Sequence, residues 1–311
     1  MTPATRISVA IPVFNEEQAL PELLGRVTRV LDGIPGGPHE IVVVDDGSTD
    51  GTFDVLTAEM QRDRRVVAIA LSRNFGHQLA LTAALDHVSG DLVVVMDGDL
   101  QDSPEAIETL LARQRDGYDV VYARRTKRKE AWFLRACYFL FYRLATRLSQ
   151  TPLPVDAGDF AVLTRRVVDR LKEVPEHQRY LRGLRAWVGF RQTGIPIERA
   201  ERRKGRSKYD SFRLIGLALD GLLAFSVAPL RGATILGLLA VGVSILFALY
   251  AVYVKVVGGT TPQGFTALIV AMTFLAGVEL IVLGIVGEYV GRVYEEVKRR
   301  PHYIIDRIER R

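Results

Sequence analysis

Residues 92–102 read LVVVMDGDLQD, an apolar run typical of a buried β-strand that ends in Asp97, Asp99 and Asp102. Because side chains alternate along a strand, Asp97 and Asp99 leave its end on one side, about 7 Å apart along the chain. Two such carboxylates suit Mg²⁺ or Mn²⁺ carrying a diphosphate, since these ions keep waters and take one or two carboxylates. Residues 102–105 (DSPE) are typical of a helix start, with Asp102 as its cap. This stretch alone leaves a polar turn without metal as the alternative.

The first half of the chain alternates strand-like runs with helical stretches, which predicts an α/β fold with a mostly parallel sheet covered on both faces. In such sheets ligands gather at the carboxyl ends of the strands. We expect strands at 7–13, 40–45, 66–72, 92–96 and 119–123, and helices at 16–31, 52–61, 77–88 and 104–114. Polar clusters follow four of these strands, at 15–17, 45–48, 73–74 and 97–99. The sequence therefore predicts one binding site at this edge, although a sheet with polar loops and no substrate is the alternative.

The second half of the chain is apolar, which accounts for the 48% hydrophobic content of the 311 residues. Residues 232–254 are uncharged and long enough to cross a bilayer, and 265–290 form a second apolar segment. Basic residues precede the first and follow the second, while only Lys255 lies between them. This asymmetry predicts a multi-pass protein of the cytoplasmic membrane with both termini cytoplasmic. The net charge of +5 comes largely from these flanking residues, so nucleic acid is not expected as a partner. Glu279 is costly in lipid, so it is expected to face the other apolar segment or, as the preferred alternative, to pair within a homo-oligomer.

Two further stretches are predicted to lie at the membrane surface. Residues 132–148 are rich in aromatics and leucine, with arginines at helical spacing, and 209–228 carry a narrow polar stripe. Helices that pack on the globular domain instead are the alternative. The predicted organisation is a domain over 1–210, the two amphipathic helices, transmembrane helices at 232–254 and 265–290, and a basic cytoplasmic tail at 291–311.

Several motifs in order along the chain resemble one known family. They are IPVFNE (11–16), VDDGSTDGT (44–52), LSRNFG (71–76), MDGDLQD (96–102), GDF (158–160), RRKGRSK (202–208) and GEYVGR (287–292). The chain resembles, over nearly its full length, the family 2 glycosyltransferases with a GT-A (Rossmann-like) fold that act on polyisoprenyl phosphates. It is most similar to the bactoprenol glucosyltransferases.

The resemblance implies roles for individual residues. Asp99, Gln101 and Asp97 are expected to bind the metal. Asp46 is expected to accept a hydrogen bond from the base of the nucleotide. The remaining nucleotide-sugar contacts, including the cations expected to neutralise phosphates, are Pro12, Phe14, Glu16, Asp97, Gly98, Arg124, Arg202 and Lys208.

Asp159 matches the family's catalytic base. Residues 156–159 (DAGD) are also a good turn sequence, which is the structural alternative. A phosphate monoester is largely dianionic at neutral pH, so we expect Asp159 to orient the attacking oxygen, or to bind a cation beside it, as much as to remove a proton.

The resemblance implies an inverting transfer of one sugar, with UDP-glucose as the expected donor and a polyprenyl phosphate as the acceptor. UDP-aminoarabinose derivatives, GDP-mannose and UDP-GlcNAc are alternative donors. A processive synthase is disfavoured because residues 178–182 (QRYLR) do not supply a Gln-x-x-Arg-Trp motif. A membrane-anchored nucleotide-sugar sensor or flippase component is the non-enzymatic alternative.

Overall fold

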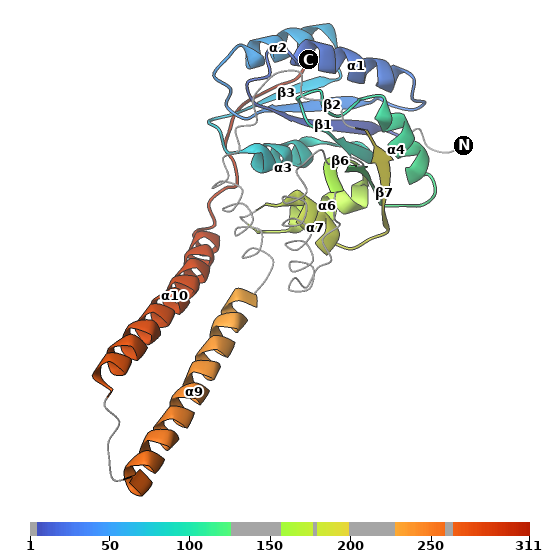
Figure 1. The fold of residues 1–311 in the computed structure, drawn as a ribbon. Coiled ribbons are helices and arrows are strands. Elements are labelled where there is room, and N and C mark those ends of the chain that lie inside the picture. Colours follow the sequence, from blue (N-terminus) through green and yellow to red (C-terminus); the bar gives the residue numbers. More distant parts are fainter. Residues whose placement is uncertain (1–4, 126–156, 177–178, 199–227, 259–263) are drawn as a thin grey trace. The chain divides into compact units, whose positions relative to one another are not determined.

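The structure is a computed structural model, and it describes residues 5–125, 157–176, 179–198, 228–258 and 264–311 (Figure 1). The chain divides into two compact units. One comprises Met1–Tyr142, Thr151–Lys208 and Arg300–Arg311, and the other comprises Arg143–Gln150 and Tyr209–Arg299. Both predicted amphipathic segments, 132–148 and 209–228, fall outside the described residues, except for Ala228.

The first unit is built on an eight-stranded sheet with the order β7-β5-β6-β4-β1-β2-β3-β8. Strands β3, β2, β1 and β4 run parallel, as expected, whereas β6 enters antiparallel between β4 and β5. The strands are β1 (Ile7–Val13), β2 (Glu40–Asp45), β3 (Val66–Leu71), β4 (Leu92–Val95), β5 (Val120–Arg125), β6 (Ala157–Thr164), β7 (Gln192–Ile197) and β8 (Ile305–Glu309). The mostly parallel α/β sheet is confirmed.

Helices cover both faces of this sheet because its buried strands are apolar on both sides. Alternate residues such as Val9 and Ile11 pack with α1, α2 and α4, while Ala10 packs in a second core with α3, α6 and α7. The helices are α1 (Leu20–Asp32), α2 (Thr52–Arg62), α3 (His77–His87), α4 (Ala106–Gln114), α6 (Arg165–Glu173) and α7 (Leu181–Trp187).

Two helices begin later than the sequence suggests. Residues 16–19 form a turn, and α1 starts at Leu20 with a proline in its first turn, where a missing N–H is harmless. Helix α4 starts at Ala106 with Glu105 at its N-cap position. The expected cap, Asp102, lies in the preceding turn, where it is buried. The alternative of a turn at residues 156–159 is not found in its described part, because β6 begins at Ala157.

The edge of the sheet opposite the strand carboxyl ends holds a buried carboxylate. Glu40 accepts hydrogen bonds from the Ser8 hydroxyl, from the Ser89 amide at 2.5 Å and from Arg6 Nη2 at 2.8 Å. Burial alone would raise the pKa of Glu40, but these hydrogen bonds and the charge of Arg6 outweigh it and hold the pKa below 4.5.

Residues that follow the apolar helices return to the sheet. Strand β8 pairs antiparallel with β3, with Ile69 opposite Ile308. The Tyr303 hydroxyl donates to Asp86 at 2.8 Å, and the Arg307 guanidinium lies 4.3 Å from the centre of the Phe53 ring. The segment expected as a basic tail therefore contributes an edge strand.

The second unit contains two long helices, α9 (Ala228–Gly258) and α10 (Phe265–Lys298), which contact one another. Gly232–Val257 and Val270–Lys298 are long and apolar enough to cross a membrane. Large side chains on them are exposed, as at Leu238 (68%), and apolar surface of this extent is typical of a lipid-facing helix. These features indicate membrane association. Glu279 is exposed on α10, and its pairing stays a prediction.

Candidate active site

The polar residues that follow the strands converge at one edge of the sheet. Val13 at the end of β1 lies opposite Asp45 at the end of β2. Strand β6 runs antiparallel to β4, so it begins at this edge. Val95 lies opposite Ala161, and the same register continued by two residues sets Asp97 opposite Asp159. Two of the predicted site residues, far apart in sequence, therefore become neighbours.

The loops after β1 and β2 are tied together by side-chain hydrogen bonds. The Asn15 amide donates to Ser48 Oγ at 2.9 Å, and the Thr49 amide donates to Asn15 Oδ1 at 2.8 Å. The Glu16 amide donates to Thr52 Oγ1 at 2.9 Å. These bonds fix the half-buried Glu16 at the sheet edge.

The other two nucleotide candidates from this segment differ in exposure. Pro12 is buried within β1, whereas the ring of Phe14 is 42% exposed just beyond the strand. Of the two, only Phe14 presents a ring that a flat ligand could contact.

Asp46 holds the loop that leads into α3. Its Oδ1 accepts from the Phe75 amide at 2.7 Å and its Oδ2 from the Gly76 amide at 2.9 Å. Burial raises the pKa of Asp46, and the two amide bonds only partly oppose this effect. Gly47, at φ +67°, lets the turn approach closely, since a Cβ there would lie 2.5 Å from the Arg73 carbonyl carbon. Both carboxylate oxygens predicted to face a base thus position protein backbone.

A cluster of three possible metal ligands forms around Asp97. The ligand atoms of His77, Asp97 and Asp159 lie within 4.8 Å of one another, and His77 Nε2 is 3.4 Å from Asp97 Oδ1. The two carboxylates are oxygen donors of the kind that Mg²⁺ and Mn²⁺ prefer, and cis ligands on these ions are about 3 Å apart at bond lengths near 2.1 Å. Asp99 Oδ1 instead accepts the backbone amide of Gln101 at 3.1 Å. The metal roles of Asp99 and Gln101 stay predictions.

Gly98, between the two carboxylates, is buried against β1. A Cβ at this position would lie 2.7 Å from Val13 Cγ1 and 3.0 Å from the Pro12 carbonyl oxygen. The absence of a side chain therefore allows the loop after β4 to pack on β1.

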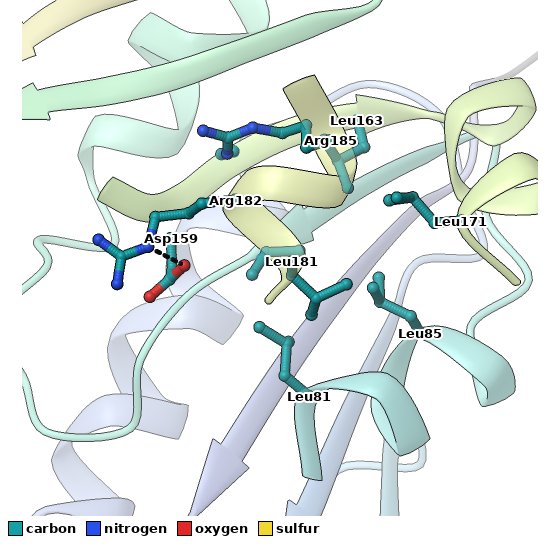
Figure 2. A pocket seen from close by; sticks show the side chains of 10 residues that line it. Leu81, Leu85, Asp159, Leu163, Leu171, Leu181, Arg182 and Arg185 are labelled. Carbon is teal, nitrogen blue, oxygen red and sulfur yellow. Dashed lines mark ion pairs between the residues drawn. The ribbon is translucent and has the colours of Figure 1, made fainter. Parts of the chain in front are cut away.

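Asp159 lies beside two arginines of α7 (Figure 2). Arg182 Nε is 3.1 Å from Asp159 Oδ1, and Arg185 is buried behind the ion pair. Leucines from α3, α6, α7 and β6 line the rest of this pocket, which has an empty volume of about 290 Å³ that includes open solvent: Leu81, Leu85, Leu163, Leu171 and Leu181. The apolar lining strengthens charge interactions at its mouth.

The remaining predicted cations are only partly described. Arg124 lies near the end of β5, opposite Ala157 of β6, and is exposed at the same edge. Arg202 and Lys208 fall outside the described residues.

Comparison with known proteins agrees with this architecture. Residues 8–172 match the model of glycosyl transferase family 2, which covers the strands β1 to β6 and the carboxylate cluster. The chain belongs to glycosyl transferase family 2. This family 2 enzyme has the GT-A-like sheet expected from its motifs.

Relatives align with the transferase over almost its whole length. The uncharacterized glycosyltransferase YkcC of Bacillus subtilis is 40% identical over 96% of this chain and 93% of its own. The SfII prophage-derived bactoprenol glucosyl transferase of Shigella flexneri is 39% identical over 98% and 99%. Among solved structures, the mannosyltransferase PcManGT from Pyrobaculum calidifontis, in complex with GDP-Man and Mn²⁺, has a TM-score of 0.49 at 20% identity, over 94% and 88%.

Sequence reasoning missed part of the transferase's site. It assigned no role to His77, and it did not identify Arg182 or Arg185. A usable signal existed for the arginines, because their spacing of three residues places both on one face of a short helix. Their contacts with β6 depend on tertiary packing and could not be read from that spacing.

Proposed function

We propose that this transferase moves glucose from UDP-glucose to the phosphate of a membrane polyprenol, with inversion at the anomeric carbon. The observation that carries the proposal is the alignment with bactoprenol glucosyl transferases at 39% identity over 98% of the chain. The carboxylates at the sheet edge support it, because a nucleotide-sugar diphosphate needs a divalent cation and an ordered polar site.

The donor would bind along the edge formed by β1, β2 and β4. Phe14 and Glu16 would contact the nucleotide, and Asp46 would shape its site through the loop that it holds. Arg124, together with Arg202 and Lys208, would neutralise phosphate charge.

His77, Asp97 and Asp159 would hold Mg²⁺ or Mn²⁺ here, with Asp99 and Gln101 as the candidates that the family resemblance adds. The ion would supply stabilisation of the charge that develops on the departing diphosphate. Asp159 would orient the acceptor oxygen beside this site.

Chain connectivity supports a membrane arrangement in which both ends of the helical hairpin lie on one side. The chain leaves the first unit before α9 and returns to it after α10, because β8 pairs with β3. A chain that leaves and rejoins one body would cross a bilayer an even number of times, so the two ends of the hairpin would lie on one side. The basic residues around these ends favour the cytoplasmic side of the inner membrane.

The proposal is tested with membranes that contain the protein, labelled UDP-sugars and polyprenyl phosphate, with matched membranes lacking the protein as control. We expect label in a lipid product from UDP-glucose, loss of that product with EDTA, and recovery with Mg²⁺ or Mn²⁺. Transfer from another UDP- or GDP-sugar alone would replace the donor assignment. Nucleotide-sugar binding without any lipid product would favour the sensor or flippase alternative, and full activity in EDTA would refute the metal requirement.

A further inference from the structure

Helix α7 brings two guanidinium groups to the start of β6. Arg182 Nε is 3.1 Å from Asp159 Oδ1, and its Nη1 donates to the Ala157 carbonyl at 3.3 Å. Arg185 contacts the Gly158 carbonyl through Nη1 and Nη2, at 3.4 and 3.5 Å. One helical face therefore holds three consecutive residues of the strand that carries Asp159 (Figure 2).

Helix α7 also places a second, buried cation behind the ion pair of Arg182 and Asp159. Arg185 is 4% exposed, and its guanidinium lies 4.8 Å from the centre of the Tyr122 ring. Burial lowers its pKa to about 10, so the group remains charged at neutral pH. Within the described part of the chain no carboxylate lies within ion-pair distance of Arg185. Asp159 thus lies beside two guanidinium groups, and a further anion beside Arg182 would be stabilised by both.

This cationic side is separated from the proposed nucleotide end. Asp46 follows β2, whereas Asp159 is on β6, and the order β6-β4-β1-β2 puts three strand spacings between them. At about 4.8 Å per spacing this is roughly 14 Å, a distance that a nucleotide sugar extended along the edge would span. The base of the nucleotide would therefore lie at the far end of this edge, and the sugar and the acceptor phosphate would meet near Asp159.

We propose that Arg182 forms the acceptor-phosphate subsite, where its guanidinium binds the phosphate of the polyprenyl phosphate and keeps the Asp159 carboxylate beside it. This inference rests on the proposed function. A phosphate monoester is mainly a dianion at neutral pH, so it needs a cation more than it needs a base. The planar fork of arginine can serve a carboxylate and a phosphate together, which a lysine cannot reproduce. In the transfer, a phosphate oxygen bonds to the sugar C1, and the bond from C1 to the nucleoside diphosphate breaks with its electron pair.

The test uses the full-length protein in nanodiscs, with the variants Arg182→Gln and Arg182→Lys. Arg170→Gln is the matched control, because Arg170 on neighbouring α6 makes an exposed ion pair with Glu173 away from the pocket. Three quantities are measured: the KM for polyprenyl phosphate, the affinity for UDP-glucose, and the binding of polyprenyl phosphate relative to the uncharged polyprenol.

We expect Arg182→Gln to raise the acceptor KM at least tenfold and to abolish the preference for phosphate over alcohol, while UDP-glucose affinity changes less than twofold. Arg182→Lys should recover part of the acceptor affinity, and Arg170→Gln should behave like the wild type. The unchanged donor affinity shows that the variant is folded.

Three results would overturn the inference. They are an unchanged acceptor KM with a lower kcat, an equal loss of donor affinity, and a phosphate preference that survives in Arg182→Gln. These results leave the proposed function standing, because the wild type still forms the lipid product. If the wild type neither binds polyprenyl phosphate in preference to polyprenol nor glucosylates it, the proposed function itself fails, and the subsite fails with it.

Discussion

Replacing Asp46 with asparagine should lower the melting temperature of the protein before any ligand is added. The sequence suggests that this carboxylate contacts the base of the nucleotide, in which case the free protein would not depend on it. The structure shows instead that its two oxygens accept the amides of Phe75 and Gly76. The two interpretations therefore predict different stabilities for the ligand-free variant.

The magnitude follows from the two hydrogen bonds. Asparagine keeps one acceptor, while its NH₂ group faces the other backbone amide and leaves a half-buried donor unsatisfied. A lost bond to a charged group costs about 1.5–3 kcal/mol, and an unsatisfied buried donor costs about 1–3 kcal/mol. Removing the buried charge offsets part of this, because the pKa of Asp46 is raised by burial. A net loss of about 2 kcal/mol corresponds to roughly 4–8 °C for a domain of this size.

The assay is thermal unfolding of the purified full-length protein with and without UDP. Asp54→Asn is the control, because Asp54 is exposed in the first turn of α2 and its helix-dipole contribution is small, about 0.3–1 kcal/mol. A variant that melts with the wild type but binds UDP more weakly would refute the loop-holding role. That result would restore the direct contact with the base.

Two other substitutions distinguish a residue needed for sugar transfer from a residue needed for stability. Gly98→Ala forces a methyl group against Val13, so we expect at least a tenfold loss of labelled lipid product, whereas Gly25→Ala, where a Cβ meets nothing within 4 Å, should keep wild-type transfer. Glu40→Gln should lower the melting temperature at pH 7 without changing UDP-glucose affinity. Because the folded-state pKa of Glu40 is lowered, its stabilisation is present above pH 4.5 and is lost as the pH falls through the folded pKa. Melting curves should therefore converge in acid, and a constant difference would contradict this role.

The elements predicted from sequence are those whose local pattern is strong. Apolar runs such as 40–45 and 92–95 are buried on both faces, and they lie where expected. Strand β7 was not predicted, because Gly194 and Pro196 weaken a strand pattern. Its position at the sheet edge tolerates both residues. Strand β8 (IDRIE) is short and charged, so its sequence does not predict a strand. It is a strand because it pairs with β3.

In the site, too, some residues could be identified from the local sequence, whereas their contacts depend on tertiary packing. Asp97 and Asp159 could be selected because acidic residues next to predicted strands and family motifs are visible in the sequence. That they lie opposite one another depends on β6 entering antiparallel beside β4, which local patterns do not specify. The contact of Arg182 with Asp159 depends further on where α7 packs. The contacts between site residues were therefore harder to predict from the sequence than the candidate residues themselves.

The pairing of β8 with β3 also bears on the order in which the protein folds. Until residues 305–309 are synthesised, β3 has an open edge, and unpaired edges of this kind invite intermolecular association. Those residues follow both apolar helices in the chain, so the ribosome makes them only after the hairpin. The sheet can then be completed only once both apolar helices have been synthesised, so the pairing of β8 with β3 is a late step in the folding of this unit.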